Sequence, residues 1–220
     1  MSRLKKLYEN TVGRVAPSYE QELEASVVGC TTLLDVGCGA YSPIGRFTRK
    51  SVEQGGVDAT GVDAFAPSIE RSRAAGLHRQ YVQMDILKIA EHFASRSFDC
   101  VLASDVIEHL TKEDGFKLLD QMEQVASKRV IVFTPNGFVP QGEYDKNPWQ
   151  VHISGWTADE FERRGYTVYG MGGAKPLKGE YGRLKFKPAK LWYLIADLTQ
   201  PFVRRSPSRA YQLLAIKEIA

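Results

Sequence analysis

The sequence predicts an α/β fold, a three-layer sandwich in which a mostly parallel, seven-stranded sheet carries helices on both faces. Short β-branched or apolar runs alternate with amphipathic stretches, which is the pattern of parallel strands joined by crossover helices. A hydrophobic content of 43% over 220 residues is enough to bury one core. We therefore expect a single domain over 1–220.

Each predicted strand is a short run rich in aliphatic or aromatic residues and bounded by turn residues, a pattern that favours strand over helix. The predicted strands are 31–36, 57–63, 79–84, 98–104, 128–134, 166–171 and 211–216.

The segments between the strands have helical patterns. Helices are predicted near 43–50, 67–75, 86–94 and 111–126. Pro67 suits a first helical turn and Thr111 suits an N-cap. Thr157 and Glu160 form a capping box that opens a further helix, which Gly165 ends.

The segment 172–207 differs in composition from the rest and is predicted to be a basic, aromatic insertion or lid. Residues 172–190 are rich in Gly, Pro and Lys, and a short apolar block follows at 191–196. Between 174 and 210 there are nine Lys or Arg against two acidic residues, so this segment carries +7 of a chain whose net charge is +3.

Composition also bears on the compartment. No run approaches the roughly 18 to 20 apolar residues of a membrane span, and the start of the chain lacks the apolar core of a secretory signal. The three cysteines match neither a disulfide framework nor a zinc site. We expect a cytoplasmic protein, either a monomer or a homodimer.

Polar residues follow the ends of four predicted strands. Gly37 and Gly39 let the first strand turn tightly into a helix whose unpaired N–H groups face a ligand. Asp63 ends the second strand, where a carboxylate can accept the two hydroxyls of a ribose. Asp85 ends the third strand and suits an adenine amino group, and Ser104 ends the fourth. The carboxyl ends of parallel strands meet at one crevice, so these groups predict a nucleotide-type pocket.

This set of motifs, covering about 31–171, resembles motifs I to IV of class I S-adenosylmethionine-dependent methyltransferases, which have a Rossmann-like fold. The resemblance implies that S-adenosylmethionine is the cofactor, with the methionine part near Asp35, Gly37 and Gly39, and the sulfonium near Ser104. One departure is Tyr41, which stands where many members have a third glycine and becomes a candidate wall of the pocket. The predicted cofactor-binding residues are Asp35, Gly37, Cys38, Gly39, Asp63, Ala64, Asp85, Ile86 and Ser104.

A second group of polar residues is predicted on the acceptor side. Asp105, Glu108 and His109 have a spacing that puts all three on one face of a helical turn. His152 follows the fifth strand, whose carboxyl end opens onto the same crevice. Glu108, His109 and His152 are therefore the predicted catalytic residues.

Two chemical interpretations of this group stay open. In the first, His109 or His152 is a general base toward a hydroxyl, because an imidazole titrates near neutral pH. The second comes from a resemblance of Asp105, Glu108, His109 and His152 to the metal-dependent 2′-O-methyltransferases of small-RNA ends and to ubiquinone-pathway O-methyltransferases. It implies that these residues hold a divalent cation, with Asp105 standing where a glutamate is usual. A third, structural interpretation is that Glu108 and His109 only brace the loop.

The acceptor is predicted only by class. We expect O-methylation of a small molecule or of a glycan-linked or lipid-linked acceptor, with N-methylation or RNA 2′-O-methylation as alternatives. Trp149 and Trp156 are candidates for stacking on a sugar or for anchoring their loop. The segment 183–209 combines basic and aromatic residues, so it can contact an anionic membrane surface or pack as a helix on the sheet. A non-catalytic cofactor-binding protein and an NAD-dependent oxidoreductase are alternatives of other classes.

Overall fold

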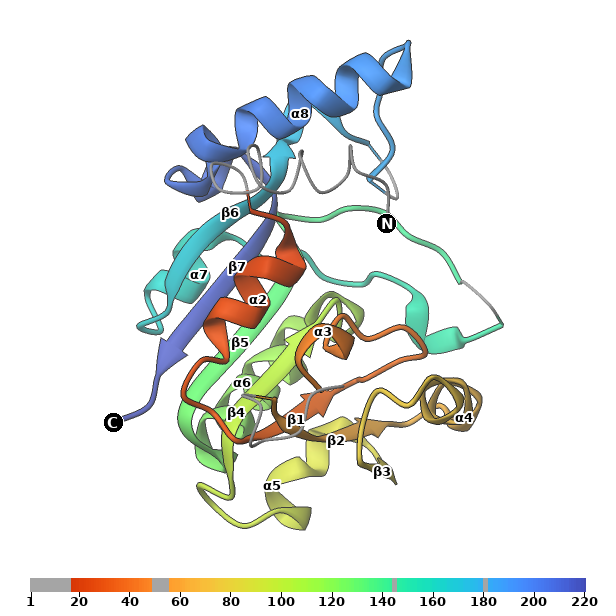
Figure 1. The fold of residues 1–220 in the computed structure, drawn as a ribbon, viewed down its shortest axis with the longest axis vertical. Helices are drawn as coiled ribbons and strands as arrows, with labels where there is room; N and C mark the ends of the chain where they lie inside the picture. Colours follow the sequence, from red (N-terminus) through yellow and green to blue (C-terminus); the bar gives the residue numbers. More distant parts are fainter. Residues whose placement is uncertain (1–16, 49–55, 144–145, 180–181) are drawn as a thin grey trace.

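A computed structural model describes residues 17–48, 56–143, 146–179 and 182–220, which form one seven-stranded sheet with helices on both faces (Figure 1). The strands are β1 (Thr32–Val36), β2 (Asp58–Asp63), β3 (Gln80–Gln83), β4 (Phe98–Ser104), β5 (Ala126–Pro135), β6 (Thr167–Ala174) and β7 (Ala210–Glu218). The predicted fold class and all seven predicted strands are confirmed.

The strand order is β3-β2-β1-β4-β5-β7-β6. The first five strands are parallel, and β7 runs antiparallel to both β5 and β6. Because β2 and β3 follow β1 on one side and β4 and β5 lie on its other side, the strand order reverses between β1 and β4. In open parallel sheets, ligands bind at the carboxyl ends of the strands beside such a reversal.

Two hydrophobic layers enclose the sheet. On one face, α5 (Ile89–His92), α6 (Lys112–Val125) and α7 (Ala158–Glu162) pack over the central strands. On the other face lie α2 (Tyr19–Ser26) and α3 (Gly45–Thr48). The predicted N-cap of α6 is confirmed, since the Thr111 side chain accepts a hydrogen bond from the Asp114 N–H.

The helices agree with the predictions except in two places. The helix expected at 67–75 is α4 (Ala66–Ala75), and the region 86–94 holds a short 3-10 helix followed by α5. The end of the helix expected near 43–50 lies outside the described residues. Helix α2 was not predicted, although Ser18 and Gln21 form a capping box at its start.

The second difference lies in the segment 172–207. It contains the end of β6, a 3-10 turn at Lys175–Leu177, and helix α8 (Ala189–Arg204), for which the sequence predicted no bounds but which agrees with the alternative that 183–209 packs as a helix on the sheet. Helix α8 packs against β6, the edge strand (Figure 1). No helix in the described ranges has the length and apolarity needed to cross a membrane.

Candidate active site at the strand ends

The turn after β1 requires glycine at two positions. Gly37 and Gly39 have φ values of 67° and 54°, in the left-handed region that disfavours side chains. A Cβ on Gly37 would lie 2.6 Å from Val106 Cγ2. The N–H of Cys38 donates to the Val62 carbonyl at 2.9 Å, which ties the turn to β2. The backbone of β1 can therefore closely approach whatever lies beside the turn.

Asp63 at the end of β2 holds this turn in place. Its two carboxylate oxygens accept hydrogen bonds from the Gly39 N–H at 2.9 Å and from the Phe65 N–H at 2.8 Å. Burial raises the pKa of Asp63, while these two hydrogen bonds act in the opposite direction. Asp63 thus links the glycine turn to the second strand and also faces the cavity described next.

A cavity of about 530 Å³, here called the strand-end cavity, lies at the carboxyl ends of β1 to β4. Its size is in the range of small-molecule and cofactor sites. The residues that line it are Gly37, Gly39, Asp63, Ala64, Gln83, Met84, Asp85, Ile86, Leu87, Asp105, Val106, His109, Leu110, Asn147, Trp149 and Gln150.

Six of the nine predicted cofactor-binding residues line this cavity: Gly37, Gly39, Asp63, Ala64, Asp85 and Ile86. Carboxylates stand at three strand ends (Asp63, Asp85 and Asp105), and Met84, Ile86, Leu87 and Leu110 supply apolar walls between them. Such a slot, apolar along its walls and acidic at fixed points, fits the flat base and the hydroxyls of a nucleoside. The donor and acceptor groups therefore suit the cofactor that the sequence implies.

The other three predicted residues, Asp35, Cys38 and Ser104, do not line the strand-end cavity. Asp35 is buried, with an oxygen 2.8 Å from His78 Nε2 and 2.6 Å from the Ser42 hydroxyl. Ser104 accepts a hydrogen bond from the Tyr19 hydroxyl at 2.9 Å. Both side chains are hydrogen-bonded to neighbouring residues and lie outside the cavity lining.

Cys38 and Tyr41 have contrasting positions near the same turn. Cys38 is buried, and burial raises its thiol pKa, so it is a protonated, packed residue at neutral pH. Tyr41, considered as a wall, is 82% exposed and does not line the cavity. The sequence analysis missed His78, because a lone histidine before β3 carries no motif.

Glu108 lies in a short 3-10 helix, Ile107–His109, that follows β4. Its carboxyl group is buried, and Oε2 accepts a hydrogen bond from the Thr134 hydroxyl at 2.9 Å. Its other oxygen, Oε1, is buried and has no hydrogen-bond partner. Burial, followed by the nearby charge of Asp105, raises the pKa of Glu108 well above its usual value. Burial therefore disfavours the ionised form of this carboxyl group.

His109 and His152 each make a hydrogen bond from Nδ1 to a backbone carbonyl. His109 Nδ1 is 3.1 Å from the Val151 carbonyl, and His152 Nδ1 is 2.7 Å from the Val139 carbonyl. A carbonyl only accepts, so each Nδ1 carries the hydrogen and each neutral ring has its lone pair on Nε2. Burial lowers the pKa of both rings, that of His109 to about 4. Both imidazoles are therefore neutral at pH 7.

Backbone contacts bring His152 to His109 across 42 intervening positions. The N–H groups of Ile153 and Ser154 donate to the Glu108 carbonyl at 3.0 and 3.1 Å. The Trp156 indole N–H donates to the Ile107 carbonyl at 3.2 Å. The loop after β5 is thereby fastened to the turn after β4, and the two rings lie 4.7 Å apart between centroids.

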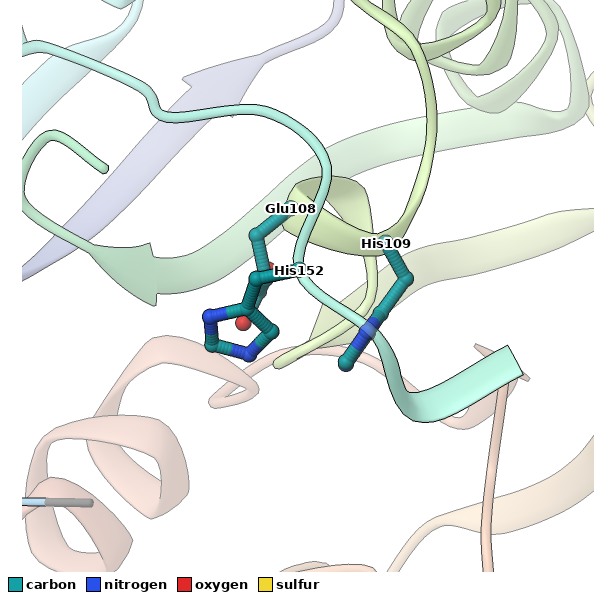
Figure 2. Close-up of side chains that lie close together, drawn as sticks. All are labelled: Glu108, His109 and His152. Atoms are coloured by element: carbon teal, nitrogen blue, oxygen red, sulfur yellow. The ribbon is translucent and has the colours of Figure 1, made fainter. Parts of the chain in front are cut away.

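The three predicted catalytic residues form one cluster (Figure 2), here called the Glu108 cluster. One ligand atom from each of Glu108, His109 and His152 lies within 4.8 Å of the other two. The unpartnered Glu108 Oε1 and the two Nε2 lone pairs suit a divalent cation, and histidines whose Nδ1–H binds a carbonyl are typical of metal ligands. Asp105, the fourth residue of the predicted set, is not part of this group within the described chain.

The Glu108 cluster lines a second cavity and borders the strand-end cavity through His109. A second cavity of about 500 Å³, the histidine cavity, is lined by Glu108, His109 and His152 together with Val139, Lys178 and Tyr211 among others. The histidine cavity and the strand-end cavity share Asp105, His109 and Gln150 as wall residues. The two cavities are therefore neighbours that share part of a wall.

The two tryptophans of the loop separate into different roles. Trp156 is fully buried against Phe116 and Phe161 and anchors the loop to the core. Trp149 is 62% exposed and lines the strand-end cavity. Sequence reasoning left both roles open for both residues.

Comparisons with known proteins agree with this geometry. Residues 34–134 match the family model described as a methyltransferase domain. A Ubiquinone biosynthesis O-methyltransferase from Bradyrhizobium sp. (strain ORS 278) is 34% identical over 102 residues, which cover 43% of this chain. The match spans only 37% of that curated relative's length.

Solved structures share the fold over nearly the whole chain. A SAM dependent methyltransferase from Archaeoglobus fulgidus superposes with a TM-score of 0.55 at 17% identity, covering 99% of this chain and 100% of that one. The plantazolicin methyltransferase BpumL, solved in complex with SAH, gives a TM-score of 0.52 at 18% identity, covering 99% and 90%.

Proposed function

We propose that this chain, whose residues 34–134 match a methyltransferase domain model, is a class I, S-adenosylmethionine-dependent methyltransferase that methylates a hydroxyl oxygen of an acceptor bound at the Glu108 cluster. The observation that carries the proposal is the position of that cluster. It lies in the histidine cavity, and His109 is also a wall of the strand-end cavity.

In this proposal the cofactor occupies the strand-end cavity. Asp63 holds the ribose hydroxyls, Asp85 and Ile86 hold the adenine, and the Gly37–Gly39 turn lies along the methionine part. When bound, S-adenosylmethionine supplies an electrophilic methyl group on a sulfonium. The protein's own contribution is to align the acceptor oxygen with that group and to exclude water.

The Glu108 cluster would receive the acceptor proton. His109 and His152 both present an unprotonated Nε2 at neutral pH, because burial lowers their pKa values. The hydroxyl proton would pass to one of these nitrogens as the oxygen–carbon bond forms and the methyl carbon–sulfur bond breaks, with S-adenosylhomocysteine as the leaving group. The same rings hold the hydroxyl by hydrogen bonding before transfer.

A divalent cation is a second interpretation of the same cluster, supported by the unpartnered Glu108 Oε1. Glu108, His109 and His152 would hold it, and it would lower the pKa of an acceptor hydroxyl. Two imidazoles and one carboxylate favour Zn²⁺, Mn²⁺ or Fe²⁺ over Mg²⁺.

Oxygen is favoured over nitrogen as the acceptor atom. A neutral base or a bound cation helps most where the acceptor must lose a proton, as a hydroxyl does. The similarity to an O-methyltransferase supports the same atom. The methyltransferase match argues against an NAD-dependent oxidoreductase.

The test is methyl transfer from labelled S-adenosylmethionine to a panel of phenols, catechols, glycans, amines and short RNAs. We expect His109→Gln and His152→Gln to lower turnover with the hydroxyl acceptor by about a hundredfold or more, the usual size of a general-base contribution. Affinity for S-adenosylhomocysteine, measured by calorimetry, should stay within about threefold. A fully active His109→Gln variant would remove His109 from the mechanism.

The matched control is His92→Gln, which alters an exposed histidine on α5 and should leave turnover unchanged. Chelation separates the two interpretations of the cluster. Activity that EDTA abolishes and Mn²⁺ or Zn²⁺ restores assigns a cation to Glu108, His109 and His152. Activity that EDTA leaves intact assigns the imidazole base.

A further inference from the structure

Helix α8 exposes several of its large apolar side chains. Its inward face carries Ala196, Gln200 and Val203, all buried. The Gln200 side chain donates to the Gly170 carbonyl and accepts from the Gly173 N–H, both at 2.9 Å, so polar bonds fix the helix to β6. The residues on the opposite face that are exposed are Leu191, Leu194, Leu198 and Phe202.

These four residues form one stripe, here called the α8 stripe. Their spacing of three, four and four positions keeps them on one side of a helix that turns about 100° per residue. Leu198 is 57% exposed and Phe202 is 76% exposed. A helix on the surface of a globular domain normally turns its large apolar side chains inward. Within the described ranges nothing covers the α8 stripe.

Positive charge lies at both ends of the α8 stripe. Lys185 and Lys187 precede the helix, Arg205 and Arg209 follow it, and all four are exposed. Arg204, by contrast, turns away to pair with Glu22 at 2.7 Å. An apolar stripe between cationic ends is the pattern of a helix that lies in the surface of an anionic bilayer.

We propose that α8 is an interfacial helix that docks this protein on an anionic lipid surface. The α8 stripe enters the acyl boundary, and the flanking lysines and arginines contact phosphate groups. The charges disfavour a second copy of the chain as the occupant. Whether two α8 helices pair parallel or antiparallel, cationic ends meet cationic ends and repel.

A cavity beneath the helix supports the lipid surface as the partner, a step that rests on the function proposed above. This α8 cavity, of about 810 Å³, is lined by Phe202 of the stripe and by the basic residues Lys175, Lys178, Lys185 and Arg209, and among the described residues its lining holds no acidic one. It shares Val139, Lys178 and Tyr211 with the histidine cavity. An amphipathic anionic acceptor can therefore reach the Glu108 cluster from the docked face.

The test is flotation of the full chain with two kinds of vesicle, one of equal parts phosphatidylcholine and phosphatidylglycerol and one of phosphatidylcholine alone. We expect the protein to bind the anionic vesicles at least tenfold more tightly than the neutral ones. Binding to the anionic vesicles should weaken in 0.5 M NaCl, because salt screens the attraction between the basic residues and the lipid phosphates. Leu194→Glu and Leu198→Glu should each lower this binding about tenfold or more. Val28→Glu alters an exposed apolar residue away from α8 and is the matched control, with unchanged binding.

Affinity for S-adenosylhomocysteine, unchanged in all three variants, verifies that they are folded. The proposal is overturned if the wild type binds both kinds of vesicle equally. It is also overturned if Leu198→Glu binds the anionic vesicles as tightly as the wild type does. A wild-type dimer in solution that Leu198→Glu converts to a monomer overturns it as well, because the stripe then faces a second copy. Intact vesicle binding with no methyl transfer would instead overturn the proposed function and leave the docking surface standing.

Discussion

At the scale of single residues, Asp63 joins local structure to ligand binding. Its carboxylate braces the glycine turn through Gly39 and the start of α4 through Phe65, and it also lines the strand-end cavity. A group already held by two backbone N–H donors is fixed in position before a ligand arrives. Such preorganisation strengthens binding, because less conformational entropy is lost when the ligand binds.

Asp63→Ala is expected to weaken S-adenosylmethionine binding at least tenfold, which corresponds to about 1.4 kcal/mol. The reason is loss of both the ribose acceptor and the brace on Gly39. Calorimetric titration measures the affinity, and Asp58→Ala, at the half-buried start of the same strand and outside the cavity lining, serves as the control. Unchanged affinity in Asp63→Ala would mean that the ribose lies elsewhere.

At the scale of elements, the contact between α6 and the loop after β5 positions His152. Gly115 lies on the buried face of α6, and a Cβ there would overlap the indole of Trp156. Trp156 in turn donates to Ile107 beside the Glu108 cluster. The absence of a side chain at Gly115 therefore lets the loop reach the turn that carries Glu108 and His109.

Gly115→Ala tests which of two opposed effects is larger. Helix propensity alone favours alanine by about 1 kcal/mol, whereas overpacking a core contact costs about 1–3 kcal/mol. Because the overlap is with a fully buried ring, we expect a net loss of stability in denaturant unfolding, with lower turnover as His152 shifts. Gly142→Ala, where a Cβ meets nothing within 4 Å, should be close to neutral. A rise in the unfolding free energy of Gly115→Ala would contradict this packing argument.

At the scale of the whole molecule, buried titratable groups couple the site to stability. His109 has its pKa lowered to about 4 in the folded protein, against about 6.5 when unfolded. Between these two pH values the His109 imidazole is protonated in the unfolded chain and neutral in the folded chain. The contribution of His109 to the free energy of unfolding is therefore fully present above pH 6.5 and is lost as the pH falls toward 4. Glu108, with a raised pKa, acts in the opposite sense and loses its contribution as the pH rises above 4.5.

With EDTA present, the unfolding free energy of the wild type relative to His109→Gln should increase as the pH rises from about 4 to 6.5. The upper limit is about 1.4 kcal/mol per pH unit for one proton. Glu108→Gln should show the opposite trend, becoming relatively more stable as the pH rises through the same range. Urea unfolding at several pH values measures both differences, and parallel curves for His109→Gln and the wild type would refute a lowered pKa.

The sequence by itself determined the sheet and the main wall of the strand-end cavity. Strand runs and turn residues act locally, so the seven strands and the positions of Gly37, Gly39, Asp63 and Asp85 at strand ends follow from neighbours along the chain. Helix α2 was missed because its capping box, Ser18 with Gln21, precedes a weakly amphipathic stretch.

Only the tertiary structure decided which side chains are free to act. The engagement of Asp35 by His78 crosses 43 positions, and the meeting of His109 with His152 depends on backbone bonds between two loops. The outward turn of the α8 stripe was decided in the same way, because polar bonds from Gln200 to β6 fix the opposite face inward. Periodicity and turn chemistry are properties of neighbouring residues, whereas burial and pairing are set by packing between segments that are distant along the chain.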